Sequence, residues 1–375
     1  MTTGSPELDR LMYSGRILVL PGEAFRLAPW AETRPELDRW RGMFIGLAVG
    51  DALGNTSESL SPDQRRDRFG EIVDYPPNQR AGGRPVGLPS DDTQLCALAV
   101  EQILADDVFS PIAWLDLARS RRIFGVGGTV RLAFRRLAQG LPWPEAAQGA
   151  SRGAGNGALM RCPGIFAAHL ATDGQRLAAD AALFAAATHN DFAAISSSVA
   201  FSIMLAELLV MREPPDPAWW VQRYVELAAP LEGDVCYRGR GAPAAVGYEG
   251  PLWKYVADQV PGLLESGASV LDAGAAFLSG AYLMETVPMV LFTLAKHGHD
   301  PEAAIVRAVN DTKDNDTMAA IVGAAVGALH GESTIPRVWR GGLLGWITAD
   351  DDGALFALLD RLEARLTESD PRGAR

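Results

Sequence analysis

The sequence predicts an all-α protein organised as one large helical domain. Apolar residues recur at intervals of three and four from Trp40 onward, which is the period of an amphipathic helix. Clusters of Gly, Pro and Asp divide this pattern into helix-sized segments, and the alternation typical of strands is scarce. We expect the domain to cover residues 39–370, and a chain of 375 residues with 48% apolar content can bury a substantial core.

Eight segments have the periodicity of helices, with Asp, Ser or Thr before them and Gly or Pro after them. The expected helices are 39–53, 92–104, 112–120, 174–187, 192–211, 270–284, 301–309 and 317–330. Residues 213–262 contain many Pro, Gly and aromatic residues, so we expect either a surface excursion or a connection between two halves of a bundle.

Residues 1–38 differ from the rest of the chain, being rich in charge and Pro with one stretch, 15–20, that reads as extended. We interpret them as an N-terminal extension. They could pack on their own domain as a lid or cap, or act as an arm that enters a partner's cleft or adds to its sheet.

Charge and cysteine usage restrict the partners and the compartment. The net charge of -12 disfavours binding to nucleic acid or to an anionic membrane. Cys96, Cys162 and Cys236 lie far apart without CxxC spacing, so we expect buried thiols in a reducing compartment. No secretory signal and no membrane-spanning run are visible, which predicts a cytoplasmic protein.

Glycines recur at helical spacing in two of the apolar helices. Gly46, Gly50 and Gly54 are four residues apart, as are Gly323 and Gly327, so each set lies on one helical face. Because glycine within a helix costs close to 1 kcal/mol relative to alanine, its repeated use indicates close backbone approach. Either the helices simply pack tightly, or they also meet beside a functional site.

Two acidic clusters precede apolar helices. The first is Ser90-Asp91-Asp92-Thr93, and the second contains Asp314, Asp316 and Thr317. Each cluster alone fits a polar helix cap. Adjacent carboxylates repel one another unless a cation lies between them, and oxygen-only ligands suit Mg²⁺, Mn²⁺ or Ca²⁺. The occurrence of both clusters on apolar helices favours two half-sites of a binuclear metal centre that folding brings together.

The chain resembles the ADP-ribosylglycohydrolase family in five blocks that occur in the family's order. These are Gly46-Leu-Ala-Val-Gly-Asp-Ala-Leu-Gly54 followed by Glu58, Ser90-Asp-Asp-Thr-Gln94, Gly155-Asn-Gly-Ala-Leu-Met-Arg161, Thr188-His189 and Asp314-Asn-Asp-Thr317. The resemblance implies an orthogonal multi-helix bundle with a binuclear Mg²⁺ or Mn²⁺ centre at the bottom of a cleft.

The resemblance also implies residue roles, which we carry over by position. The expected metal ligands are Ser90, Asp91, Asp92, Asp314, Asp316 and Thr317. Glu58, Asp92 and Asp316 are the expected catalytic residues. ADP-ribose would contact Gly127, Gly128, Thr129, Gly153, Gly155, Asn156, Gly157 and His189.

Some residues keep two interpretations. Asp51 could support the metal ligands or form a polar contact between helices, and Arg161 could form a structural ion pair or bind substrate. Ser90 stands where the family usually has Thr, and Thr312-Lys313 replaces its Gly-Gly, so a lysine lies beside the expected ligands. Residues 121–128 contain no aspartate that could serve as general base.

The implied activity is metal-dependent hydrolysis of the ADP-ribosyl linkage on a modified protein side chain, with an arginine guanidine as the expected leaving group. The alternative function is an immunity protein that occludes an ADP-ribosyltransferase toxin through residues 1–38, with or without hydrolysis.

Overall fold

The computed structural model describes residues 2–149, 154–345 and 353–368, and it confirms the all-α fold class. The α-helices are α1 Pro6–Tyr13, α2 Leu37–Gly54, α3 Pro62–Phe69, α4 Asp91–Asp106, α5 Pro111–Ser120, α6 Gly128–Ala138, α7 Trp143–Ala146, α8 Leu177–Ala186, α9 Phe192–Leu208, α10 Pro217–Glu232, α11 Leu252–Glu265, α12 Val270–Phe277, α13 Leu283–His297, α14 Pro301–Asp311, α15 Asn315–His330, α16 Arg337–Gly342 and α17 Ala354–Glu368. Within these described ranges, no helix is long and apolar enough to cross a membrane.

Short elements connect the helices. The 3-10 helices are η1 Glu23–Arg26, η2 Asn55–Ser57, η3 Gln79–Ala81, η4 Cys162–Ala168, η5 Pro243–Ala245 and η6 Glu332–Thr334. Two antiparallel ribbons pair β1 Pro77–Asn78 with β2 Arg84–Pro85, and β3 Tyr237–Arg238 with β4 Glu249–Gly250.

Helices α2 and α15 form the centre of the molecule and run antiparallel in close contact. The carbonyl oxygen of Gly323 occupies the position that a Cβ at Gly46 would need, and Gly42 faces Gly327 in the same way. At the other end of the contact, Gly54 lies against the backbone of Asp316. The expected close approach is confirmed, and it brings the C-terminal end of α2 beside the first turn of α15.

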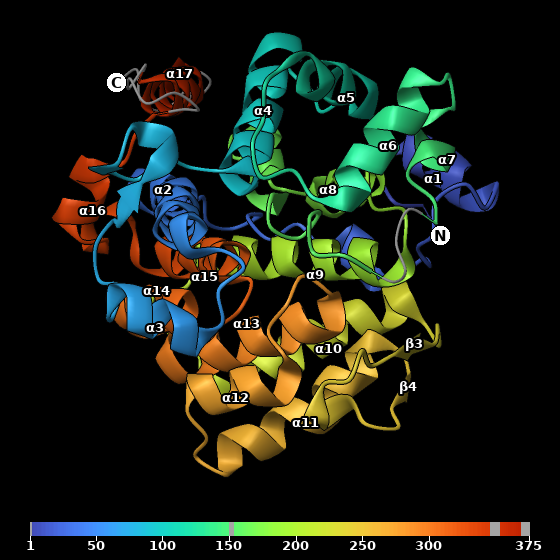
Figure 1. Ribbon diagram of the computed structural model, residues 1–375. Helices are drawn as coiled ribbons and strands as arrows, with labels where there is room; N and C mark the ends of the chain where they lie inside the picture. The colour runs from blue at the N-terminus through green and yellow to red at the C-terminus, as the bar shows by residue number, and fades with distance from the viewer. Residues whose placement is uncertain (1, 150–153, 346–352, 369–375) are drawn as a thin grey trace.

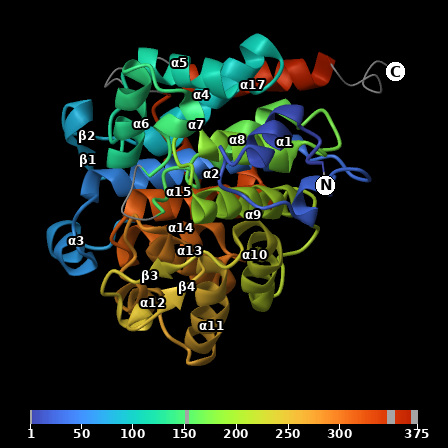
Figure 2. The ribbon, with the colours of Figure 1, turned by 90° about the vertical axis from the view of Figure 1, so that its right-hand side faces the viewer.

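The remaining helices cover this central pair from opposite sides. In both Figure 1 and Figure 2, α4, α5 and α17 lie on one side of α2 and α15, and α10 to α13 lie on the other. Helix α9 runs through the middle and buries nearly every side chain, because Ala, Ser and other small residues let its neighbours approach on all sides.

The structure corrects two expectations, about residues 270–284 and Cys236, and excludes one of the two alternatives for residues 213–262. Residues 270–284 do not form one helix: Leu278 and Ser279 adopt positive φ angles of 69° and 44°, so the chain turns between α12 and α13. Residues 213–262 are not a surface excursion, because α10 and α11 carry fully buried aromatic side chains such as Trp220 and Tyr255 into the core. Cys96 and Cys162 are buried, but Cys236 is exposed.

Residues 2–36 pack on the helical domain. Leu8, Phe25 and Trp30 are at most 2% exposed and belong to the main hydrophobic core. The extended stretch is held by polar contacts, since the backbone N–H of Leu18 donates to Asn190 Oδ1 and that of Leu20 to the carbonyl of Leu231. The segment therefore shares the core of the domain that follows it.

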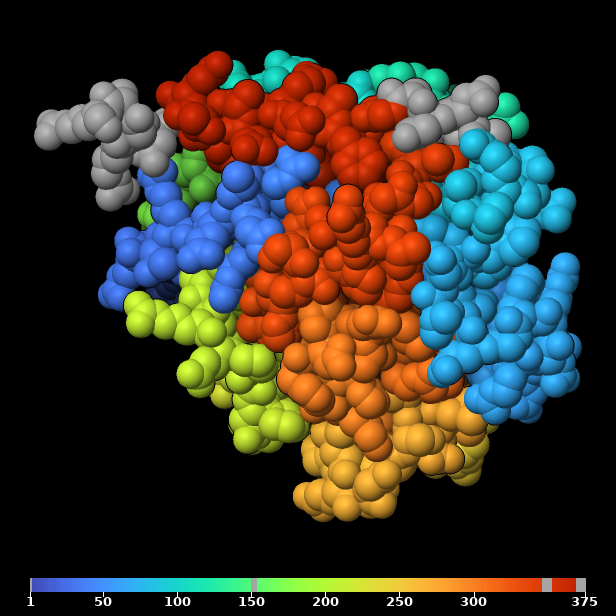
Figure 3. Space-filling model, turned by 90° about the vertical axis from the view of Figure 1, so that its left-hand side faces the viewer, coloured from blue at the N-terminus to red at the C-terminus, as the bar shows by residue number. Residues whose placement is uncertain are grey.

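The segment between α3 and α4 packs against the C-terminal part of the chain, as the neighbouring blue and red-orange surfaces of Figure 3 show. The Tyr75 hydroxyl donates to the carbonyl of Trp339, and the Trp339 indole donates to the carbonyl of Val73. These contacts hold the chain that leads from η2 to the first acidic cluster.

Candidate active site

The two acidic clusters meet where three helix ends converge. The antiparallel contact brings the end of α2 to the start of α15, and the start of α4 lies beside both. Carboxylate oxygens of Asp51, Asp92 and Asp316 lie within 4.8 Å of one another. Oxygens of Glu58, Asp314 and Asp316 form a second group with the same spacing. Asp316 belongs to both groups, so five carboxylates form one continuous cluster.

Asp51 holds the start of α4 in place. Its fully buried carboxylate accepts hydrogen bonds from the backbone N–H and the hydroxyl of Ser90, at 2.8 and 2.6 Å. It also accepts from the N–H and hydroxyl of Thr93, at 3.1 and 2.6 Å. In most helices a side chain at the N-cap accepts hydrogen bonds from the first backbone N–H groups, but in α4 an aspartate from α2 takes this role. Asp51 therefore forms the expected polar contact between two helices, and its support of metal ligands stays a prediction.

The clusters are not ordinary helix caps. Ser90 and Asp314 occupy the N-cap positions of α4 and α15, yet neither side chain accepts a capping hydrogen bond from a backbone N–H of its own helix. The Ser90 hydroxyl donates to Asp51, and Asp314 Oδ2 accepts from Asn156 Nδ2 at 2.6 Å. The side chains face the cluster instead.

Burial and mutual repulsion raise the pKa values of the five clustered carboxyl groups and of the neighbouring Asp91. Burial raises the pKa of Asp91 to about 8, with the charge of Asp51 adding to the effect. The pKa of Asp314 rises to about 6, also through burial. Burial and the neighbouring carboxylates raise the pKa values of Asp92 and Asp316 well above the ordinary range. Without a positive charge, the cluster therefore favours bound protons.

The donor set fits divalent cations. Asp92 Oδ1 is buried, and the described residues offer it no hydrogen-bond partner. The Ser90 hydroxyl donates its hydrogen bond to Asp51, so the lone pairs of its oxygen remain available to a cation. Carboxylate and hydroxyl oxygens are ligands that Mg²⁺ and Mn²⁺ accept, and a cation would offset the repulsion among the carboxylates.

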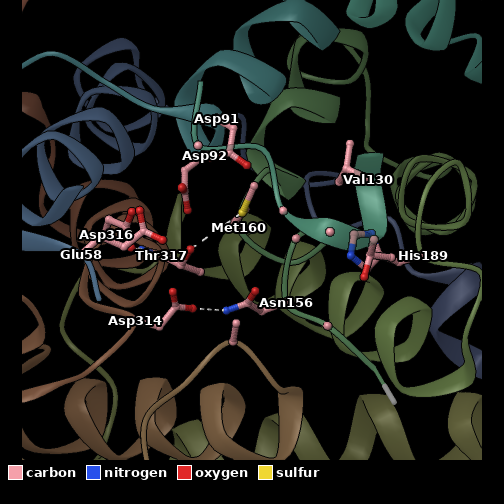
Figure 4. A pocket seen from close by; sticks show the side chains of 17 residues that line it. Glu58, Asp91, Asp92, Val130, Asn156, Met160, His189, Asp314, Asp316 and Thr317 are labelled. Carbon is pink, nitrogen blue, oxygen red and sulfur yellow. Dashed lines mark hydrogen bonds between the residues drawn. The ribbon is translucent and has the colours of Figure 1, made fainter. Parts of the chain in front are cut away.

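A pocket of about 160 Å³ extends from the acidic cluster. Figure 4 shows Glu58, Asp314 and Asp316 at one end and Val130 and His189 at the other. The expected site residues that line it are Glu58, Asp91, Asp92, Gly127, Gly128, Thr129, Gly155, Asn156, Gly157, His189, Asp314, Asp316 and Thr317. Ser90 does not line this pocket but lies in the adjoining cavity, and Gly153 lies outside the described residues.

Two glycine-containing segments form walls of the pocket for different reasons. A Cβ at Gly127 or Gly128 would meet no atom within 4 Å, so packing leaves room there at the start of α6. A Cβ at Gly157 would lie 2.9 Å from His189 Cε1, so that glycine makes space for the imidazole. The backbone N–H of Asn156 donates to the carbonyl of Ala281 and is already paired.

Arg161 fixes the far end of the pocket from behind. Its buried guanidinium stacks between Trp114 and Phe184, 4.8 Å from each ring centroid. It donates to the carbonyl of Gly157 at 2.5 Å and to the Thr188 hydroxyl at 2.8 Å. Thr188 Oγ1 lies 2.8 Å from His189 Nδ1. Arg161 therefore connects the Gly157 wall to the histidine, and its hydrogen bonds go to two carbonyls and a hydroxyl, not to a carboxylate as an ion pair would need.

The state of His189 follows from its partners. The Thr188 hydroxyl oxygen accepts a hydrogen bond from Arg161, which can only donate, so the Thr188 hydroxyl can donate to His189 Nδ1. Burial lowers the pKa of His189 to about 3, with the charge of Arg161 contributing, so the ring is neutral. The proton of a neutral ring then lies on Nε2, the nitrogen next to Gly155 and Gly157.

Sequence reasoning missed several pocket residues. Met160 lies in the block that ends at Arg161, and its sulfur lies 3.8 Å from the Thr317 hydroxyl. Gly125 has a φ of 88°, and a Cβ there would overlap the Asp91 carboxylate. Ala281 follows the turn that divides α12 from α13 and has no feature in the sequence that marks it. Lys313 is exposed, and its charge is among the smaller influences that lower the pKa of Asp314.

Comparison with known proteins matches this arrangement to one family. The sequence profile described as ADP-ribosylglycohydrolase matches residues 32–372. The ADP-ribosyl-[dinitrogen reductase] glycohydrolase of Rhodospirillum rubrum is 27% identical over 80% of this chain and 89% of its own length. The ADP-ribosylarginine hydrolase Tri1 of Pseudomonas putida is 24% identical over 85% of this chain and 80% of its own. A solved structure titled ADP-ribosylglycohydrolase-related protein complex aligns with a TM-score of 0.63 and 27% identity, covering 88% of this chain and 98% of that one.

Proposed function

This chain belongs to the ADP-ribosylglycohydrolase family and is a glycosyl hydrolase of ADP-ribosyl linkages, and from that premise we propose that it removes ADP-ribose from modified arginine with the help of Mg²⁺ or Mn²⁺. The observation that carries the proposal is the continuous cluster of five carboxylates at one end of the pocket. The name of the Pseudomonas putida relative supports arginine as the modified residue.

Ser90, Asp91, Asp92, Asp314, Asp316 and Thr317 would hold two divalent cations. When bound, such cations polarise sugar oxygens and lower the pKa of water. The orphaned Asp92 Oδ1 and the shared position of Asp316 support this assignment. Asp51 orients Ser90 from behind, and Asn156 orients Asp314.

The reaction joins a water oxygen to the anomeric carbon of the ribose while the bond from that carbon to the guanidine nitrogen breaks. Glu58 is exposed at the edge of the cluster, and partial burial together with the charges of Asp314 and Asp51 raises its pKa. We assign Glu58 the proton from the attacking water, which it returns to the leaving guanidine. Asp92 and Asp316 keep the ribose hydroxyls oriented during this transfer.

Release of ADP-ribose from an arginine-modified protein, measured by mass spectrometry with Mg²⁺, Mn²⁺ or EDTA, tests the function. Asp91→Ala and Asp316→Ala should each lower the rate at least 100-fold, whereas Asp67→Ala, on the exposed surface of α3, should not. Full activity in EDTA, or in both site variants, would remove the metal assignment. Serine-linked ADP-ribose as a parallel substrate tests the choice of arginine.

The immunity hypothesis concerns residues 1–38 and a toxin partner. Leu8, Phe25 and Trp30 are buried in the shared core, which supports packing of this segment on its own domain over a role as a partner-binding arm. We propose that packing role. Binding of an ADP-ribosyltransferase to the full chain, lost on substitution of the exposed Tyr13, would favour the immunity function instead.

A further inference from the structure

A second cavity of about 190 Å³ adjoins the acidic end of the pocket. It lies between η2, η3 and the loop before α6, and it shares Glu58 and Gly125 with the main pocket. Ser90 also lines it. The two cavities are thus neighbours that share a residue of the acidic cluster and a glycine in their linings.

The walls of this second cavity are polar. Asn55, Asn78 and Gln79 contribute amide groups, and Phe124 contributes a ring over which the Arg80 guanidinium lies at 4.4 Å. Thr56 Oγ1 is buried, and within the described part of the chain it has no hydrogen-bond partner. A buried hydroxyl without a partner destabilises the folded protein, and a bound polar group would offset that cost.

The direction of the substrate follows from the proposed function and from the position of the carboxylates at one end of the main pocket. The proposed cleavage occurs at the ribose held by the carboxylates, and the rest of ADP-ribose extends toward His189, at the opposite end in Figure 4. The group attached to the anomeric carbon must therefore leave from the carboxylate end. The second cavity opens at that end, beside Glu58.

We propose that the second cavity binds the amino-acid side chain that carries ADP-ribose, with Thr56 and Phe124 as its contacts. This inference rests on the proposed function and extends it to the leaving group. Thr56 accepts a hydrogen bond from a donor on that side chain, and Phe124 packs against its stem. Gly125 lines both cavities, and a side chain there would overlap the Asp91 carboxylate.

The test separates the two halves of the substrate. Free ADP-ribose occupies only the main pocket, whereas an ADP-ribosylated arginine peptide would occupy both cavities. Thr56→Val and Phe124→Ala should each raise the KM for the peptide about 10-fold and leave the Kd of free ADP-ribose unchanged, because each removes a contact made only with the side chain that carries ADP-ribose. Thr129→Val, in the main pocket, should weaken both ligands, and the exposed Thr33→Val should alter neither.

Each other outcome has a distinct meaning. If both cavity variants keep the wild-type KM for the peptide, the cavity does not bind the leaving group. If they weaken free ADP-ribose as much as the peptide, the cavity belongs to the ADP-ribose site, and the inference fails. If the wild-type protein releases ADP-ribose from no linkage, the proposed function itself is overturned along with this extension.

Discussion

The Asp51 carboxylate on α2 accepts hydrogen bonds from both the backbone N–H and the hydroxyl of Ser90 at the start of α4. This contact orients the first acidic cluster relative to the second, because the same end of α2 packs against α15. Asp51→Asn would place an amide NH₂ group, which donates hydrogen bonds, against the N–H and hydroxyl donors of Ser90 and Thr93. We expect Mg²⁺ affinity to fall 10- to 100-fold, measured by calorimetry, as for other residues that orient metal ligands.

The matched control is Asp38→Asn, in the first turn of the same helix, where the carboxylate accepts exposed bonds from Ser333. It should leave Mg²⁺ affinity unchanged. Equal affinities in wild type and Asp51→Asn would mean that α4 keeps its position without this carboxylate.

The glycine contact between α2 and α15 predicts a large difference between two glycine substitutions. Gly46→Ala should lower the free energy of unfolding by about 3 kcal/mol, because the new methyl overlaps the Gly323 carbonyl. Gly262→Ala, on α11 with open space around it, should raise stability by up to about 1 kcal/mol. Urea denaturation of both variants checks this, and similar values would contradict the close approach.

The Thr188 contact predicts one tautomer for His189. Nitrogen-15 NMR should place the proton on Nε2 in the wild type. Thr188→Val removes the hydroxyl that donates to Nδ1, so the tautomer should become mixed and the Kd of ADP-ribose should rise several-fold. Thr188→Ser keeps the hydroxyl and should behave as wild type. A proton on Nδ1 in the wild type would refute the assignment.

The raised pKa values of the buried carboxyl groups predict that the free energy of unfolding falls as pH rises when no cation is bound. Carboxyl groups of the unfolded chain lose their protons near pH 4, whereas Asp314 and Asp91 retain theirs until about pH 6 and 8. The folded state binds more protons in this window, so stability should fall as pH rises from about 5 to 8 in EDTA.

Saturating Mg²⁺ should oppose this fall, because a bound cation favours the ionised carboxylates. Thermal melting in EDTA and in Mg²⁺ across the pH range is the measurement. A melting temperature in EDTA that rises steadily to pH 8 would show that other groups dominate.

The N-terminal segment should be needed for stability. The Trp30 indole donates to the carbonyl of Ala206 and packs against Phe166 with 5.7 Å between ring centroids. Trp30→Ala should lower the free energy of unfolding by about 3–5 kcal/mol, whereas the exposed Val246→Ala should change it by less than about 0.5 kcal/mol. Wild-type stability of Trp30→Ala would show that the segment packs only loosely.

The sequence alone determined the features that depend on neighbouring residues. Apolar periodicity predicted the helical class, and glycine spacing predicted that α2 and α15 approach closely. Neighbouring Ser, Thr and Asp side chains, whose oxygens can bind a cation, indicated both acidic clusters. The ordered blocks identified the family and its ADP-ribose linkage. The helical period, the glycine spacing and each acidic cluster lie within a few residues along the chain, so their physical basis can be read locally.

Tertiary structure decided which distant groups pair with one another. Asp51 meets Ser90 across 39 residues, and Asn315 reaches the carbonyl of Gly54 across 261. The turn at Leu278, the role of Arg161 behind His189 and the burial of Trp30 likewise depend on packing partners far away in the chain. A buried polar group takes whichever partner the packed helices bring within reach, and local sequence does not specify that partner.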